Sequence, residues 1–288
     1  MLKRSTLLHL RIPFSYFLMP IFFFALAVSS QINWLQTILA FFILHFLVYP
    51  ASNGYNSYFD KDEESIGGLK NPPKVSPELY YVALLMDALA LLLALIISPA
   101  FAVMVFIYGI VSKAYSHPAV RLKKYPITSW LTAGFFQGMF TFLMVYLAVN
   151  NVPVRSLADQ EILLPAFVST LMLLGFYPLT QVYQHREDAK RGDLTISRLL
   201  GIRGTFYFSA SMFLLADAGF FFYFYHLNQT FYFLLLQIFF LPIVLFFSFW
   251  FYKILRNEKE ASYEWTMRMN LAGSTCLMGF FITLLFLN

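Results

Sequence analysis

Long apolar runs separated by short polar segments make up most of the sequence. A helix needs about 20 mostly apolar residues to cross the roughly 30 Å hydrocarbon layer of a bilayer, and nine runs suit this length. They lie at residues 13–30, 33–55, 79–97, 99–115, 127–149, 162–184, 203–227, 230–252 and 265–287. The pattern therefore predicts an all-α integral membrane protein, a bundle of nine transmembrane helices that forms a single transmembrane domain over residues 1–288.

The composition supports this class. Hydrophobic residues make up 59% of the 288 residues and charged residues only 12%, against about 25% charged residues in an average soluble domain. These figures exclude a water-soluble enzyme, a disordered chain and a free nucleic-acid binder. The single cysteine, Cys276, excludes an intrachain disulfide and a cysteine-based metal site.

The lysines and arginines fall almost entirely on one side of the predicted membrane. Of the 20 such residues, only Arg155 lies in an opposite-side loop, and Arg268 belongs to the first turns of the ninth span. Because cytoplasmic loops are the Lys/Arg-rich ones, we predict a cytoplasmic N-terminus and an external C-terminus. The net charge of +5 then reflects the basic cytoplasmic loops of a membrane protein, and we expect no nucleic-acid partner.

Two polar segments, one after the second span and one after the sixth, together carry seven of the 15 acidic residues. If each span continued as a helix beyond the membrane core, residues three and four apart would share a face. The first stripe would comprise Asn53, Asn56, Asp60 and Glu63 or Glu64. The second would comprise Gln181, Gln184 and Asp188.

Such oxygen-rich stripes suit Mg²⁺, which binds a few carboxylates and bridges to substrate phosphate. The candidate metal ligands are Asn56, Asp60, Glu64, Gln184 and Asp188. Basic residues nearby would neutralise a diphosphate: Lys70, Arg121, Lys123, Lys124, Lys190 and Arg191. Either segment alone is more typical of an ordinary solvated helix end. The Asn56/Asp60 and Gln184/Asp188 pairs share the same spacing, which favours a common site.

These motifs resemble those of the UbiA-type intramembrane prenyltransferases, which have nine transmembrane helices and two Asp-rich motifs after helices two and six. The similar stretches are Asn56-Ser57-x-x-Asp60-x-x-x-Glu64, Gln184-x-x-x-Asp188 with Gly192 and Thr195, Tyr115-Ser116-x-Pro118-x-x-Arg121-x-Lys123, and Arg11-x-Pro13. Ser57, Glu64 and Gln184 stand where the family commonly has aspartate. A carboxamide at position 184 keeps an oxygen ligand but loses its charge.

The resemblance implies Mg²⁺-dependent transfer of a prenyl group from an isoprenyl diphosphate to a lipophilic, aromatic, quinone-precursor-like acceptor. It implies catalytic roles for Asp60, Asp188, Lys123 and Arg121, and diphosphate binding by Lys70, Lys124, Lys190, Arg191 and Asn56. The expected location is the cell membrane, as a multi-pass protein with its active site facing the cytoplasm.

Three alternatives stay open from the sequence. One is a phosphoribosyl-type transferase of the same family that acts on polyprenyl phosphate. The others are a degenerate, non-catalytic lipid-binding member and a transporter, although transporters place polar residues near the membrane midplane. Two acids do lie inside spans, Asp87 and Asp217, and there we expect a cavity or a polar partner.

Overall fold

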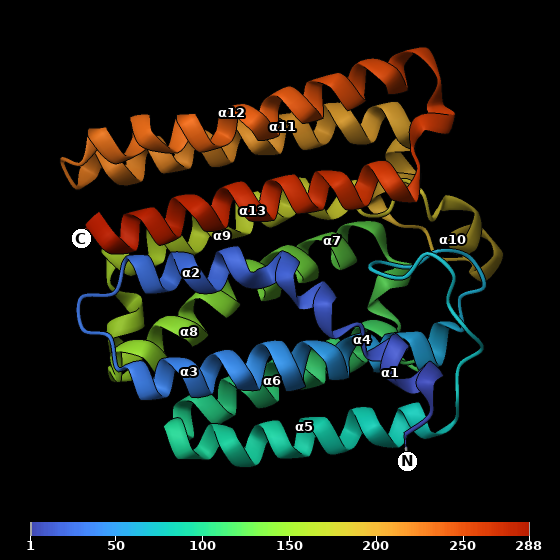
Figure 1. Cartoon of the computed structure of the whole chain (residues 1–288), viewed down its shortest axis with the longest axis horizontal. Coiled ribbons are helices and arrows are strands. Elements are labelled where there is room, and N and C mark those ends of the chain that lie inside the picture. Colours follow the sequence, from blue (N-terminus) through green and yellow to red (C-terminus); the bar gives the residue numbers. More distant parts are fainter. Residues whose placement is uncertain (1, 288) are drawn as a thin grey trace.

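The computed structural model describes residues 2–287, and within this range all the regular elements are helices and there is no strand. Nine helical segments in it are long and apolar enough to cross a membrane, which confirms the predicted bundle (Figure 1). They are Arg4–Ala27, Trp34–Asp60, Glu78–Ile97, Pro99–Ser116, Pro126–Asn150, Gln160–Leu179, Ile196–His226, Thr230–Arg256 and Tyr263–Leu287. The N-terminus lies at the end of the bundle that carries α10 (His185–Arg191), and the C-terminus at the opposite end.

Five spans are single α-helices: α5 (Glu78–Ile97), α6 (Pro99–Ser116), α9 (Gln160–Leu179), α12 (Thr230–Arg256) and α13 (Tyr263–Leu287). The seventh span, α11 (Ile196–His226), is kinked at Gly201, whose φ of 71° is not helical. The first span joins α1 (Arg4–Leu10), the 3₁₀ segment η1 (Ile12–Leu18) and α2 (Met19–Ala27). The second joins α3 (Trp34–Phe42), the π-helix η2 (Ile43–Val48) and α4 (Tyr49–Asp60). The fifth joins α7 (Pro126–Phe135), the π-helix η4 (Phe136–Phe140) and α8 (Thr141–Asn150). A π-turn inserts one residue, so it changes which side chains face the bundle interior.

Small residues and aromatic rings hold the spans together. A Cβ on Gly138 would lie 2.6 Å from the Cα of Thr170, so glycine permits η4 to pack directly on the backbone of α9. Such close approach supplies the dispersion contacts that replace the hydrophobic effect inside a bilayer. Elsewhere rings fill the interior, as where Phe24 of α2 stacks on Phe281 of α13 with 4.3 Å between centroids.

The sixth span ends earlier than the sequence predicts, so the expected helical stripe of Gln181, Gln184 and Asp188 is wrong. Helix α9 stops at Leu179, and residues 180–184 form tight turns before α10 begins. Pro178 has no N–H for the carbonyl of Leu174, and the indole of Trp130 donates to that carbonyl instead, at 2.9 Å. The stripe is broken, but its residues still reach one cavity.

The second span continues as α4 to Asp60, as predicted, and then ends at Lys61, whose φ is 50°. Glu63 and Glu64 therefore lie in the following loop and not on the predicted helical face. Further along this loop, Gly67 and Gly68 form a turn closed by the bridge between Ile66 and Leu69.

That turn lies against the first span. A Cβ on Gly67 would lie 2.5 Å from the ring of Phe14, and Gly68 has a φ of 80°, so both positions require glycine. The guanidinium of Arg11 donates to the carbonyl of Gly67 at 3.1 Å. These contacts hold the loop over the end of the bundle that bears α10.

The two acids inside spans have polar partners, as predicted. Asp87 of α5 forms an ion pair with Lys113 of α6. Asp217 of α11 accepts a hydrogen bond of 2.8 Å from the side chain of Gln237 on α12. Each pair joins two neighbouring helices.

Candidate active site

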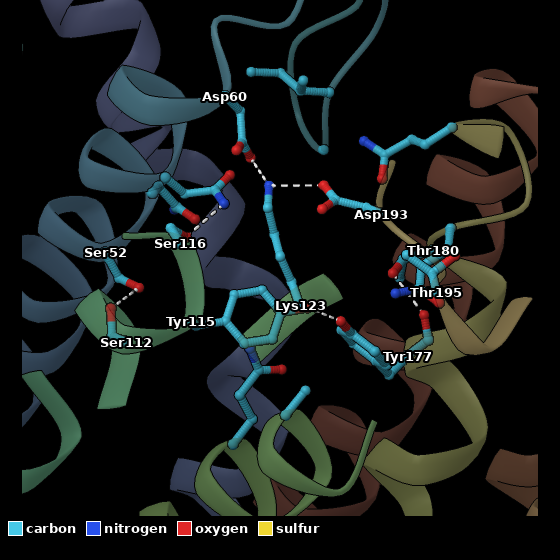
Figure 2. Close-up of a pocket in the computed structure, with 18 of the residues that line it drawn as sticks. Ser52, Asp60, Ser112, Tyr115, Ser116, Lys123, Tyr177, Thr180, Asp193 and Thr195 are labelled. Carbon is cyan, nitrogen blue, oxygen red and sulfur yellow. Dashed lines mark hydrogen bonds and ion pairs between the residues drawn. The ribbon is translucent and has the colours of Figure 1, made fainter. Parts of the chain in front are cut away.

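A cavity of about 240 Å³ opens where α4, α6, α9 and α10 approach one another (Figure 2). Its polar lining includes Arg11, Asn53, Asn56, Asp60, Asp62, Lys123, Gln184, Asp188, Arg191 and Asp193. Both predicted acidic segments therefore contribute side chains to the same space, although 128 residues separate Asp60 from Asp188 along the chain.

Helix α4 presents Asn56 and Asp60 to the cavity one turn apart. Two hydrogen bonds fix this helix against α6: Ser52 with Ser112 at 2.5 Å, and the Asn56 amide to the Ser116 hydroxyl at 2.8 Å (Figure 2). Because Asn56 donates its N–H to Ser116, its amide oxygen is left for a ligand.

The basic groups on the opposite side come from the loop between α6 and α7. Lys123 forms an ion pair with Asp60, and its Nζ lies 3.7 Å from the carboxylate of Asp193, so it bridges the two acids (Figure 2). Arg121 donates two hydrogen bonds of 2.8 Å to Asp193. The hydrogen bond to Asp193 raises the pKa of Arg121.

A second ion pair joins Asp62 to Arg191 of α10, and Arg191 also donates to the backbone carbonyl of Asp60 at 3.3 Å. Burial raises the pKa of Asp62, and the neighbouring charge of Asp60 adds to the effect. Burial alone would lower the pKa of Arg191, but the charges of Asp62 and Asp60 together raise it. This pair ties the loop after α4 to α10.

Asp188 lies in the first turn of α10, where burial raises its pKa to about 7. Thr195 donates to its carboxylate at 3.4 Å and also caps the N-terminus of α11 by accepting from the backbone of Arg198. Thr195 therefore links the carboxylate of Asp188 to the start of α11. Gln184 lines the cavity one turn before Asp188.

Five residues with predicted roles lie outside the cavity lining, and one of them is Arg121, which is paired with Asp193 of the lining. Glu64 pairs with Lys190 at 3.6 Å, and Lys190 also contacts Glu187 at 2.5 Å. Lys70 pairs with Glu264 at 2.5 Å, and Lys124 is exposed. The metal role of Glu64 and the diphosphate roles of Lys70, Lys124 and Lys190 stay predictions.

Arg11, Asp62 and Tyr177 also line the cavity, although the sequence predicts no site role for them. Asp62 was visible within the acidic run after the second span, but its offset from Asp60 placed it off the predicted stripe. The hydroxyl of Tyr177 is hydrogen-bonded to that of Tyr115 (Figure 2), a long-range contact with no local signal.

The donor set suits a hard divalent cation. Within residues 2–287, no three acidic, histidine or cysteine side chains are already arranged around a metal position. However, one carboxylate oxygen of Asp60 is buried without a hydrogen bond, and the side-chain amides of Asn56 and Gln184 add neutral oxygens. An all-oxygen set with water-accessible space fits Mg²⁺ better than a softer metal.

A second cavity of about 200 Å³ adjoins the first and reaches between η1, α9 and α13. The residues that line both are Phe14, Ser52, Asn53, Tyr108, Gln137, Tyr177 and Thr180. Most of its other lining is apolar, including Leu18, Met172, Phe176 and Leu277. A polar chamber with acids and bases thus lies directly beside a mainly apolar one.

Comparison with known proteins agrees with this arrangement. The sequence matches the model of the UbiA prenyltransferase family over residues 17–272. No curated protein matches the chain.

Solved structures share the fold. A UbiA homolog from Archaeoglobus fulgidus bound to GPP and Mg²⁺ is 15% identical with a TM-score of 0.68, and the match covers 98% of this chain and 99% of that one. A structure described for digeranylgeranylglyceryl phosphate synthase is 18% identical with a TM-score of 0.63, and the match covers 98% of both chains. Identity at this level establishes the fold alone.

Proposed function

The chain belongs to the UbiA prenyltransferase family, and from this we propose that it transfers a prenyl group from an isoprenyl diphosphate to a lipophilic acceptor in the membrane. The observation that carries the proposal is the junction of the two cavities. Acids and bases from α4, α10 and the adjoining loops line one side, and an apolar chamber begins beside them. An amphipathic substrate with a diphosphate head and a hydrocarbon tail requires such a boundary.

Magnesium is the proposed cofactor, held by oxygens of Asn56, Asp60, Asp62, Gln184 and Asp188. When bound, it supplies Lewis-acid chemistry that stabilises negative charge on the diphosphate. The Archaeoglobus fulgidus homologs solved with Mg²⁺ and either GPP or DMAPP support this choice of metal and donor.

The basic residues stabilise the leaving group. As the allylic C–O bond breaks, its electron pair goes to the diphosphate oxygen, and Lys123 and Arg191 are placed to neutralise the added charge. Arg121 orients this arrangement because it holds Asp193, which lies beside the Lys123 ammonium. The allylic cation then forms a bond to the acceptor, and the acceptor loses a proton.

Water must be kept from the cation, since it would give an alcohol instead of the transferred product. The second cavity supplies a mainly apolar environment, and the aromatic residues Tyr108, Phe176 and Tyr177 line it. Ring faces stabilise a cation by about 0.5–2 kcal/mol each.

We also propose that the cavity opens to the cytoplasm of a cell membrane. The Lys/Arg-rich loops join the spans at the end that bears α10 and the N-terminus. That end is the cytoplasmic one by the positive-inside rule.

The test uses purified protein with Mg²⁺, labelled prenyl diphosphates of several lengths and a panel of lipophilic aromatic acceptors. We expect diphosphate release and a prenylated lipid, both abolished by EDTA and restored by added Mg²⁺. Absence of product and of diphosphate release with every donor would overturn the enzymatic function. Donor binding without turnover would identify a non-catalytic lipid-binding member instead.

A further inference from the structure

The second cavity contains polar groups that the described part of the protein leaves unpaired. Asn53, Gln137 and Asn270 line it, and none of their side-chain amides has a hydrogen-bond partner within residues 2–287. Asn270 is only 6% exposed. A buried amide without a partner destabilises the fold, so these groups need another explanation than packing.

The three amides come from separate elements and converge on one space. Asn53 lies on α4, Asn270 on α13, and Gln137 in the π-helix η4. Ser274 and Leu277 follow Asn270 on the same face of α13 and line the same cavity. A few convergent polar groups in an otherwise apolar cavity are typical of a ligand site, and π-turns frequently occur at such sites.

The second cavity also lacks formal charge. No acid, lysine, arginine or histidine is among the described residues that line it. Arg11 lines the adjoining cavity and not this one; its two terminal nitrogens donate to the backbone carbonyls of Gly67 and Asn53. A carboxylate or phosphate in the second cavity would therefore lose its hydration without gaining a counter-ion among the residues that line this cavity.

The hydrocarbon tail of the donor, which the proposed function places at this cavity, cannot pair its amides. A prenyl tail alone would cover the amides of Gln137 and Asn270 without pairing them. A neutral molecule with a hydroxyl or carbonyl group matches both features, because a carboxamide donates and accepts hydrogen bonds without requiring charge.

We propose that the second cavity is the acceptor site, and that Asn270 and Gln137 select a neutral, hydroxyl- or carbonyl-bearing acceptor over one that carries a carboxylate or phosphate. This inference rests on the proposed prenyl transfer and names the acceptor class for that reaction.

Binding of matched probes tests the inference independently of turnover. The probes are a dihydroxynaphthalene and the hydroxynaphthoate that has a carboxylate in place of one hydroxyl. Their Kd values are measured on purified protein saturated with Mg²⁺ and a non-reactive thio-analogue of geranyl diphosphate. We expect the neutral probe to bind at least about tenfold more tightly. Equal binding, tighter binding of the carboxylate, or no binding of either probe would overturn the inference.

Variants identify the amides as the selecting groups. Asn270→Leu and Gln137→Leu should each raise the Kd of the neutral probe by about fivefold to tenfold, which is the effect of one lost hydrogen bond. Asn270→Gln keeps a carboxamide, so the Kd of the neutral probe should stay within about twofold of the wild-type value. The same is expected for the control Met172→Leu, which changes only the apolar lining. Unchanged binding in both Leu variants would contradict the proposed role of the amides.

The donor analogue separates this inference from the function on which it rests. Its Mg²⁺-dependent binding should be the same in the wild type, in both Asn270 variants and in Met172→Leu, because these two positions line only the second cavity. Loss of analogue binding in the wild type would count against prenyl transfer itself. Retained analogue binding with preference for the carboxylate probe would overturn only the proposed acceptor class.

Discussion

The guanidinium of Arg121 donates hydrogen bonds of 2.8 Å to both carboxylate oxygens of Asp193. The pair joins the loop between α6 and α7 to the segment between α10 and α11. Asp193 is 1% exposed, and Lys123 lies on its other side. The fork-shaped contact therefore fixes both the position of Asp193 and, through it, that of Lys123.

Arg121→Ala should strongly destabilise the protein, because it leaves a buried carboxylate with one remote partner. We expect the free energy of unfolding to fall by about 3 kcal/mol, with a lower thermal midpoint in detergent. The matched control is Arg203→Ala, which removes the exposed 3.1 Å pair with Glu258 and should cost less than about 1 kcal/mol. Similar losses in both variants would contradict the structural role of Arg121.

Asp60→Asn and Asp188→Asn should each reduce prenyl transfer by well over about tenfold while the protein still inserts and folds. The reason is the loss of a charged oxygen ligand from either side of the cavity. Donor-dependent diphosphate release measures the effect, and folding is checked by size-exclusion chromatography. Near-normal turnover in both variants would refute the assignment of these acids to the metal.

Asp62 and Glu64 are only two residues apart, but the structure places only Asp62 at the cavity. Asp62→Asn should weaken Mg²⁺-dependent donor binding by about tenfold or more, whereas Glu64→Gln should change it by less than about twofold, because Glu64 forms only exposed ion pairs. The measurement is the Kd of a thio-diphosphate donor analogue. The reverse order would restore the metal role that the sequence motif implies for Glu64.

The difference between Asp62 and Glu64 shows where prediction of the site from the sequence fails. Apolar length predicts the nine spans well, since the requirement to cross the bilayer is local and strong. The end of α4 at Lys61 depends on a left-handed residue with no glycine or asparagine to signal it. The helical stripe therefore extends two acids too far.

The site was predictable where charge and spacing carry the information. Asp60, Asp188, Lys123 and Arg191 all reach the cavity, as their positions at one membrane face suggest. The sequence cannot reveal which residues the two π-helices turn inward, because one inserted residue changes the face without changing composition. Gln137, inside the π-helix η4, is the clearest case.

Binding of Mg²⁺ should depend on pH around neutrality. Burial raises the pKa of Asp188 to about 7 in the metal-free protein, and the metal requires the deprotonated carboxylate. Affinity should therefore increase from pH 6 to pH 8, with release of a proton on binding. Calorimetry in buffers of different ionisation enthalpy measures both quantities, and Asp188→Asn should flatten the profile.

The raised pKa of Asp188 also makes the stability of the metal-free protein depend on pH. A carboxyl whose pKa is raised by folding binds its proton more tightly in the folded state than in the unfolded chain. Stability of the metal-free protein should therefore fall as the pH rises from about 4 to about 7, and Mg²⁺ should offset the loss at the upper end. A metal-free thermal midpoint that increases across this range would contradict the shifted pKa.

Gln184→Asp should strengthen metal binding, because it places an aspartate where the second motif of the UbiA family commonly has one. Gln184 lines the cavity one turn before Asp188, so the new carboxylate adds charge to the same ligand set. Without metal, its repulsion of Asp188 should raise that residue's pKa further and lower stability; with Mg²⁺, the added attraction should lower the metal Kd by about threefold to tenfold. Gln229→Asp, at the opposite end of the bundle, controls for added charge. If Gln184→Asp leaves the Kd of Mg²⁺ unchanged while Asp188→Asn abolishes binding, the metal is held without help from position 184, and the neutral amide there serves another contact.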